Sequence, residues 1–130
     1  MEIKIHTKIE REVLEDIFVT ALEGGSNYWY CLSMDAAKLI RAVVPKKEDP
    51  YLSTAILKAI ERGVEIPIND AEDESYVVGA ISMKTMKERI QKLADSPNKW
   101  ALVKHINGEG DGDSADVVFQ YLAMGEIIYS

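Results

Sequence analysis

The sequence predicts an α+β fold, in which residues 1–130 form a single compact domain of several amphipathic helices packed on a small, mainly antiparallel sheet. Three observations favour this class. The chain has 130 residues, 47% of them hydrophobic and 28% charged, which is enough to bury one core without disulfides or metals. Helical and strand patterns interleave without the strict alternation of a parallel sheet. Two strand patterns also flank a short polar turn, which indicates an antiparallel hairpin.

The amino-terminal part predicts a short strand followed by a helix. Residues 2–6 alternate polar and apolar side chains, which is typical of a strand. Thr7 and Glu10 then form a capping-box pattern, in which each side chain bonds the other residue's backbone amide. We expect the helix to end at Gly24, because glycine enters the left-handed cap conformation at little cost. The apolar positions that recur at helical spacing are Ile9, Val13, Leu14, Ile17, Phe18, Ala21 and Leu22.

Two more helices are predicted before the hairpin. Residues 35–44 have a helical pattern, although Val43 and Val44 leave a strand open. In the next helix we expect Asp49 to cap the amino terminus, with Pro50 in the first helical position. The same helix should end at Gly63.

The hairpin is predicted from residues 64–68 and 75–82, which have strand patterns on either side of the polar residues 69–74. Pro67 lies in the first of these strands and has no N–H to donate to a neighbouring strand. We therefore expect the first strand to lie at an edge of the sheet.

A capped amphipathic helix follows the hairpin. Ser82 is its expected cap, and the helix should close before Pro97. Residues 97–106, around Trp100, predict a second, short helix. The apolar positions of the first helix are expected in the core and are Met83, Met86, Ile90 and Leu93.

The carboxyl-terminal helix is predicted over residues 115–124, with Asp113 or Ser114 as its cap and Gly125 at its end. Its residues are apolar on nearly all sides, so we expect most of its faces to be buried. Residues 126–130 predict a last strand.

The charge balance narrows the classes of partner. Twenty-two acidic and 15 basic residues give a net charge of −7, which disfavours non-specific binding to nucleic acid or to anionic membranes. No apolar run approaches the roughly 20 residues that a membrane span needs. The first residues also lack the apolar run of a signal peptide. Because Cys31 is the only cysteine, the composition suits a reducing compartment, and we expect a cytoplasmic protein.

The segment "EGGSNYWY" is the strongest candidate for a binding surface. Gly24 and Gly25 would let a ligand approach the backbone, and an aromatic ring beside them offers a stacking face. The alternative is that the glycines only end the helix and turn the chain. If the aromatic residues lie in a strand, either Trp29 or the pair Tyr28 and Tyr30 must face away from the core.

Two acidic segments raise the possibility of a metal site. Carboxylates of residues 69–74 offer oxygen ligands to a hard cation, but we favour a solvated hairpin turn, because Asp and Asn bond their own backbone. The segment "NGEGDGDSAD" resembles a calcium loop, yet its twelfth position is Val118 where a glutamate is required. We expect Asp116 to favour the positive end of the helix dipole.

Catalytic patterns are missing from the sequence. His6 and His105 stand far apart and have no neighbour at zinc-ligand spacing. No nucleophile elbow and no glycine-rich phosphate loop occurs. The lone Cys31 follows bulky aromatic residues and is expected to be a small core residue.

Three segments carry a resemblance: "TALEGGSNYW", "INDAEDESY" and "DSADVVFQYLAMGEIIY". Together they resemble a group of small, uncharacterised proteins encoded by bacteriophages, prophages and their hosts. The resemblance spans nearly the whole chain. It implies a phage or prophage setting for the protein but no activity. Its anchor residues are Glu23, Gly24, Gly25, Tyr28, Trp29, Asp70, Asp73, Asp116, Gln120, Gly125, Glu126 and Tyr129.

The leading hypothesis is a non-catalytic intracellular binding module, associated with phage or prophage, that captures a small ligand or a host protein without a cofactor. We expect it to form a homo-oligomer and to direct the Trp29 ring outward, into a concavity shared with carboxylates. The expected ligand-binding residues are Glu23, Gly24, Gly25, Asn27, Tyr28, Trp29, Asp70, Asp73 and Asp116.

Two alternatives stay open. The first is an enzyme that acts on a phosphorylated or nucleotide substrate through magnesium or manganese, held by Glu23, Asp70, Asp73 and Asp116. The second is an acidic mimic of nucleic acid, because four acids between residues 10 and 16 share one helix surface. A net charge of −7 is modest for such a mimic, and a solvated helix face explains these acids as well.

Overall fold

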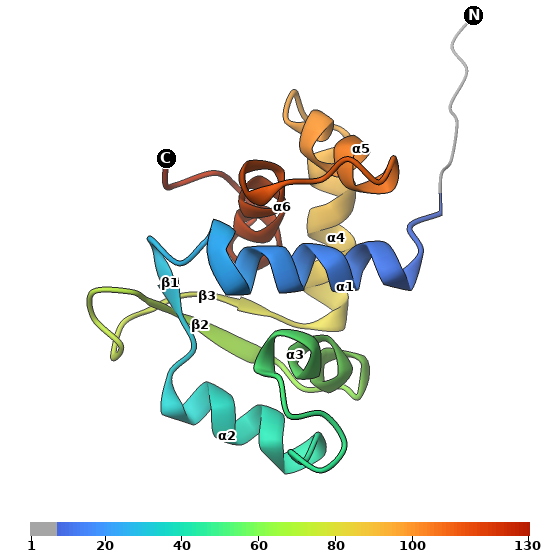
Figure 1. The fold of residues 1–130 in the computed structure, drawn as a ribbon. Helices are drawn as coiled ribbons and strands as arrows, with labels where there is room; N and C mark the ends of the chain where they lie inside the picture. The colour runs from blue at the N-terminus through green and yellow to red at the C-terminus, as the bar shows by residue number, and fades with distance from the viewer. Residues whose placement is uncertain (1–7) are drawn as a thin grey trace, which may run out of the picture.

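The computed structural model describes residues 8–130, and Figure 1 shows their arrangement. It has the predicted α+β architecture, with helices packed on a small antiparallel sheet. The predicted strand at residues 2–6 and the capping residue Thr7 lie outside the described residues. In chain order the elements are α1 (Arg11–Thr20), the π-helical turn η1 (Ala21–Gly25), β1 (Tyr30–Cys31), α2 (Met34–Val43), α3 (Leu52–Glu61), β2 (Ile66–Asp70), β3 (Val77–Ile81), α4 (Met83–Ala94), α5 (Lys99–Ile106) and α6 (Gly112–Met124).

The three strands pair in the order β1-β2-β3, and both pairings are antiparallel. The predicted hairpin is therefore confirmed. The predicted edge position of β2 is wrong, because β2 lies between the other two strands. Pro67 is nevertheless tolerated, since β1 reaches only Asn69 and Asp70 at the far end of β2. Opposite Pro67 lies Ala80 of β3, so this part of β2 has a partner on one side only.

Helices cover both sides of the sheet. In the view of Figure 1, α2 and α3 lie below the strands, while α1, α5 and α6 lie above them. The most buried element is α6, which packs against α1, α4, α5, η1 and β3. Its predicted burial on most faces is confirmed, because Ala115, Val118, Phe119, Leu122 and Ala123 are fully buried. Each other helix that lies above the sheet in this view thus packs against α6.

Several predicted helix ends are confirmed. Ser82 caps α4 and exchanges capping-box hydrogen bonds with Thr85. Gly125 ends α6 with φ +77°, the left-handed conformation that favours glycine. The pattern at 35–44 becomes a helix capped by Ser33, and the short helix predicted at 97–106 begins at Lys99.

Other helix starts differ from the prediction by about one turn. Arg11 begins α1 without a side-chain cap from Glu10. Leu52, and not Pro50, begins α3, although the Asp49 carboxylate does accept from the nearby Tyr51 amide at 3.1 Å. For α6 the predicted caps Asp113 and Ser114 are wrong: the cap is Asp111, which exchanges capping-box hydrogen bonds with Ser114 three residues later.

The first helix does not end at Gly24. It continues into the π-helical turn η1, where the amide of Ser26 bonds the carbonyl of Ala21, five residues earlier. Neither Gly24 nor Gly25 has a positive φ, so neither is needed for a left-handed cap. Gly25 is needed for another reason: a Cβ there would lie 2.5 Å from the Gly112 carbonyl oxygen at the start of α6.

Within residues 8–130, none of the helices combines the length and the apolar composition that a membrane crossing requires.

The two neighbouring glycines of η1 allow a matched test of this contact. Gly25→Ala should destabilise the protein by about 1–3 kcal/mol, because the added methyl group collides with backbone. Gly24→Ala meets no atom within 4 Å and should be neutral or stabilise by up to about 1 kcal/mol. Urea unfolding of both variants measures the difference, and equal effects would show that η1 does not pack against α6 as described.

Candidate functional site

The aromatic residues after η1 are not arranged as a strand would arrange them. Residues 26–29 form a turn, and β1 begins only at Tyr30. Trp29 and Tyr30 are therefore both buried, with exposed fractions of 2% and 9%, while Tyr28 is 51% exposed. The expected outward orientation of Trp29 is wrong, because in a turn neighbouring side chains need not alternate between two faces. Only Tyr28 faces solvent.

A single carboxylate, that of Asp116, holds this turn against α6. Its Oδ1 accepts hydrogen bonds from the Ser26 hydroxyl and from the Trp29 indole N–H, both at 2.7 Å. Its Oδ2 accepts from the Tyr28 hydroxyl at 2.5 Å and from the Gln120 amide at 3.1 Å. Asp116 is 8% exposed. These five residues form what we call the Asp116 network.

Gln120 extends the Asp116 network to the end of the chain. Its Oε1 accepts from the amides of Ile128 and Tyr129, each at 2.9 Å, and its Nε2 donates to the Tyr129 carbonyl at 3.0 Å. The side-chain amide thus takes the place of a neighbouring strand, and the last strand predicted at residues 126–130 does not form. The Tyr129 ring stacks on Trp29 with ring centres 5.1 Å apart.

The electrostatics of the Asp116 network are unusual for a buried acid. All four of its partners are neutral, and no ion pair of residues 8–130 includes Asp116. Four hydrogen bonds thus satisfy the two carboxylate oxygens, and no positive charge lies among the donors. Burial and the hydrogen bond to Asp116 raise the pKa of Tyr28 to about 12.

Beside the Asp116 network lies an open cleft of about 490 Å³, which we call the Asp116 cleft. Its lining includes Gly25, Tyr28, Trp100, Asp113 and Asp116, and it contains no lysine or arginine. Trp100 lies in the first turn of α5 and is 45% exposed. The cleft therefore combines exposed aromatic rings with carboxylates, and its volume lies in the range of small-ligand sites.

A second hollow, of about 630 Å³, adjoins the Asp116 cleft through their shared residues Gly25 and Asp113. It is lined by Glu23 and Gly24. Of the nine residues predicted to bind ligand, Gly25, Tyr28 and Asp116 line the Asp116 cleft, and Glu23 and Gly24 line its neighbour. The Trp29 ring is buried in the core. Asn27 is exposed in the turn of residues 26–29.

Asp70 and Asp73 do not join this site. The Asp70 carboxylate accepts from the amide of Glu72 at 2.7 Å, and the Asp73 carboxylate accepts from the amide and hydroxyl of Ser75. Both acids thus stabilise the turn between β2 and β3, as the solvated-turn interpretation expected. In Cys31 the thiol donates to the Asp70 carbonyl at 3.2 Å, in a half-buried position.

The four carboxylates of the metal hypothesis stay in separate local contacts. Glu23 accepts from Ser53 at 2.9 Å, Asp116 binds its four neutral donors, and the two hairpin acids bind their own turn. Across residues 8–130, no group of three or more His, Cys, Asp or Glu side chains could hold a metal ion. The described part of the chain does not assemble the expected centre.

The structure reveals one constellation that the sequence did not indicate. Ser114 Oγ lies 3.0 Å from His105 Nε2, and His105 Nδ1 lies 3.3 Å from a carboxylate oxygen of Asp16. This order of groups resembles a hydrolase triad. The Ser114 hydroxyl is fully buried, however, and also donates to the Asp111 carbonyl within the cap of α6. A substrate cannot reach it, and the three side chains instead join α1, α5 and α6.

Removing the Asp116 carboxylate should cost more stability than removing a neighbouring acid. Asp116→Ala leaves four donors without their acceptor, so we expect a loss of about 3–5 kcal/mol. The control is Asp113→Ala, an exposed position in the same helix, which should change stability by about 0.5 kcal/mol or less. Urea unfolding of both variants measures this difference. Similar losses in the two variants would mean that the network contributes little.

The raised pKa of Tyr28 predicts a fall in stability at alkaline pH. A tyrosine whose pKa rises from 10.0 to about 12 on folding stabilises the protein fully below pH 10.0. This contribution is lost as the pH rises to about 12. Urea unfolding between these limits should show a smaller fall for Tyr28→Phe than for the unchanged protein. Tyr76→Phe, at an exposed tyrosine, is the control, and a Tyr28→Phe variant that matched it would contradict the assignment.

The chain was compared with protein-family models, with curated proteins and with solved structures. No protein-family model, no curated protein and no solved structure matches it.

Proposed function

We propose that this protein is a non-catalytic intracellular binding module, associated with phage or prophage, whose Asp116 cleft captures a cationic group. The observation that carries the proposal is the lining of this cleft. It places two exposed aromatic side chains, Tyr28 and Trp100, beside two acids and no base. The phage or prophage setting rests only on the resemblance of the sequence motifs.

The chemistry of the cleft favours a positive charge carried on an apolar stem. A cation over an aromatic face gains about 0.5–1 kcal/mol at an exposed site and more where water is excluded. The lone pairs of Asp116 are already engaged by four donors. Asp113 is exposed and, among residues 8–130, belongs to no ion pair. It is therefore the carboxylate that pairs directly with the ligand.

Two sources supply this chemistry. One is an arginine or lysine side chain of a host protein, and the other is a small organic cation such as a quaternary amine. A basic side chain of a second copy would use the same contacts and would produce the expected homo-oligomer. The non-catalytic character of the module is supported by the burial of Ser114, which keeps the best-placed hydroxyl away from any ligand.

Fluorescence of Trp100 tests the proposal directly. The chain has two tryptophans, and only Trp100 is exposed, so a change that is lost in Trp100→Phe reports on the Asp116 cleft. Titration with acetyl-arginine methylamide and with choline should give saturable changes, whereas acetate should give none. Asp113→Asn should weaken binding of the cations by about three- to fivefold, as for a partly screened ion pair.

The matched control is Asp35→Asn, which removes an exposed acid from α2. If both asparagine variants bind the cations equally well, or if acetate binds as tightly as the cations, the proposed recognition is wrong. A preference for the arginine compound over choline would point to a protein partner, and the reverse preference to a small amine.

A further inference from the structure

A separate cleft lies among η1, β1, α2 and the start of α3, with a volume of about 620 Å³. We call it the Arg41 cleft. Its polar lining comprises Glu23, Arg41, Lys46, Tyr51 and Ser53. The rest of its wall is apolar and includes Leu22, Tyr30 and Leu32. In contrast to the Asp116 cleft, it carries more basic than acidic side chains, in a protein whose net charge is −7.

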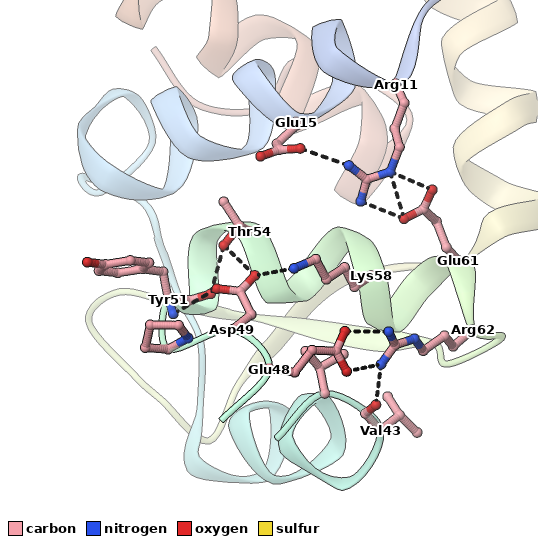
Figure 2. A network of polar contacts seen from close by, with 12 residues as sticks. Arg11, Glu15, Val43, Glu48, Asp49, Tyr51, Thr54, Lys58, Glu61 and Arg62 are labelled. Carbon is pink, nitrogen blue, oxygen red and sulfur yellow. Dashed lines mark hydrogen bonds and ion pairs between the residues drawn. The ribbon is translucent and has the colours of Figure 1, made fainter. Parts of the chain in front are cut away.

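The acids near this cleft already have partners, as Figure 2 shows. The Glu48 carboxylate pairs with Arg62, and the Asp49 carboxylate accepts from Thr54 and from Lys58. In the same region Arg11 holds both Glu15 and Glu61. These pairs use the carboxylates beside α2 and α3 and leave Arg41 and Lys46 outside every ion pair of residues 8–130.

Arg41 is held in place by neutral groups. Its guanidinium donates to the carbonyl oxygens of Val44, Asp49 and Pro50, the last at 3.0 Å. Three carbonyls fix the orientation of a group that has five N–H donors, but they leave its charge uncompensated and some donors free. A half-buried, fixed and unpaired guanidinium is a strong site for a planar or tetrahedral anion. Lys46 is exposed on the same cleft and adds a second positive charge.

Two further groups in the Arg41 cleft restrict the shape of a ligand. The Tyr51 ring is 66% exposed and points away from α3 (Figure 2), so it offers a flat face. The Glu23 carboxylate accepts from the Ser53 hydroxyl through one oxygen, at 2.9 Å. Its second oxygen can accept from a ligand N–H or O–H. The ring, the acceptor and the basic pair thus line one cleft.

We infer that the Arg41 cleft is a second binding site, which takes a small compound with an anionic group on a planar ring. The anion binds Arg41 and Lys46, the ring stacks on Tyr51, and a donor on the ligand reaches Glu23. The anion is a phosphate monoester or a carboxylate, since a guanidinium binds both through paired hydrogen bonds. This site takes the opposite charge from the Asp116 cleft, so either assignment can fail without the other.

Isothermal titration calorimetry with four probes tests the inference: adenosine monophosphate, adenosine, benzoate and inorganic phosphate. At least one of the two ring-bearing anions, adenosine monophosphate or benzoate, should bind more tightly than both adenosine and inorganic phosphate. The tighter of these two probes is then used with the variants. Lys46→Ala should weaken its binding about three- to fivefold. Tyr51→Ala, which removes the stacking face, should weaken it by about tenfold or more.

Two control variants separate the site from general charge and aromatic effects. Lys47→Ala removes a neighbouring exposed lysine outside the cleft, and Tyr76→Ala removes an exposed tyrosine of the hairpin. Both should bind the ring-bearing anion as the unchanged protein does. All four altered side chains are exposed, so the variants should fold, and circular dichroism checks this. The inference is overturned if no ring-bearing anion binds above inorganic phosphate, or if Lys46→Ala and Lys47→Ala bind alike.

Discussion

The buried carboxylate of Asp116 is the constraint on which the rest of the molecule depends. Burying an ionised group is expensive unless hydrogen bonds replace its water, and here four neutral donors do so. They come from the turn after η1 and from α6 itself. Through Gln120 the same network holds residues 128 and 129. The carboxylate therefore fixes where Tyr28 emerges, how Trp29 is sealed and where the chain ends, and these features shape the Asp116 cleft.

Much of the fold follows from local sequence. The helical spacing of apolar residues, the Ser82 cap, the left-handed Gly125 and the hairpin are all properties of short segments, and the structure has each of them. The misplaced features depend on distant partners. Trp29 is buried because its indole N–H finds a carboxylate 87 residues later in the chain, and no local pattern records that contact. The last five residues lack a strand because the side chain of Gln120 takes the place of one.

Only part of the candidate site was predicted, because its residues also come together through contacts between distant segments. Segments 23–29 and 116–120, which carry two of the sequence motifs, meet around one carboxylate and leave a cleft beside it. The hairpin acids Asp70 and Asp73 were expected there too, but Asx-type bonds within their own turn hold them. Trp100 and Arg41 were not predicted as site residues. An exposed aromatic ring or an unpaired guanidinium indicates a binding site only when it lines a cleft, and the sequence does not show the clefts. The net charge of −7 likewise does not show that one cleft is lined by acidic and the other by mainly basic side chains.

The π-helical turn at Ala21–Gly25 sets the angular position of the turn that follows it. A π-helical turn holds one more residue than an α-helical turn, so the same residues wound as an α-helix would carry the following chain further around the axis. If residues 21–25 were wound as a regular α-helix instead, Ser26 and Tyr28 would lie roughly 100° further around the axis of α1. Their hydroxyls would then point away from Asp116. The extra residue of η1 thus sets the direction from which Ser26 and Tyr28 approach α6.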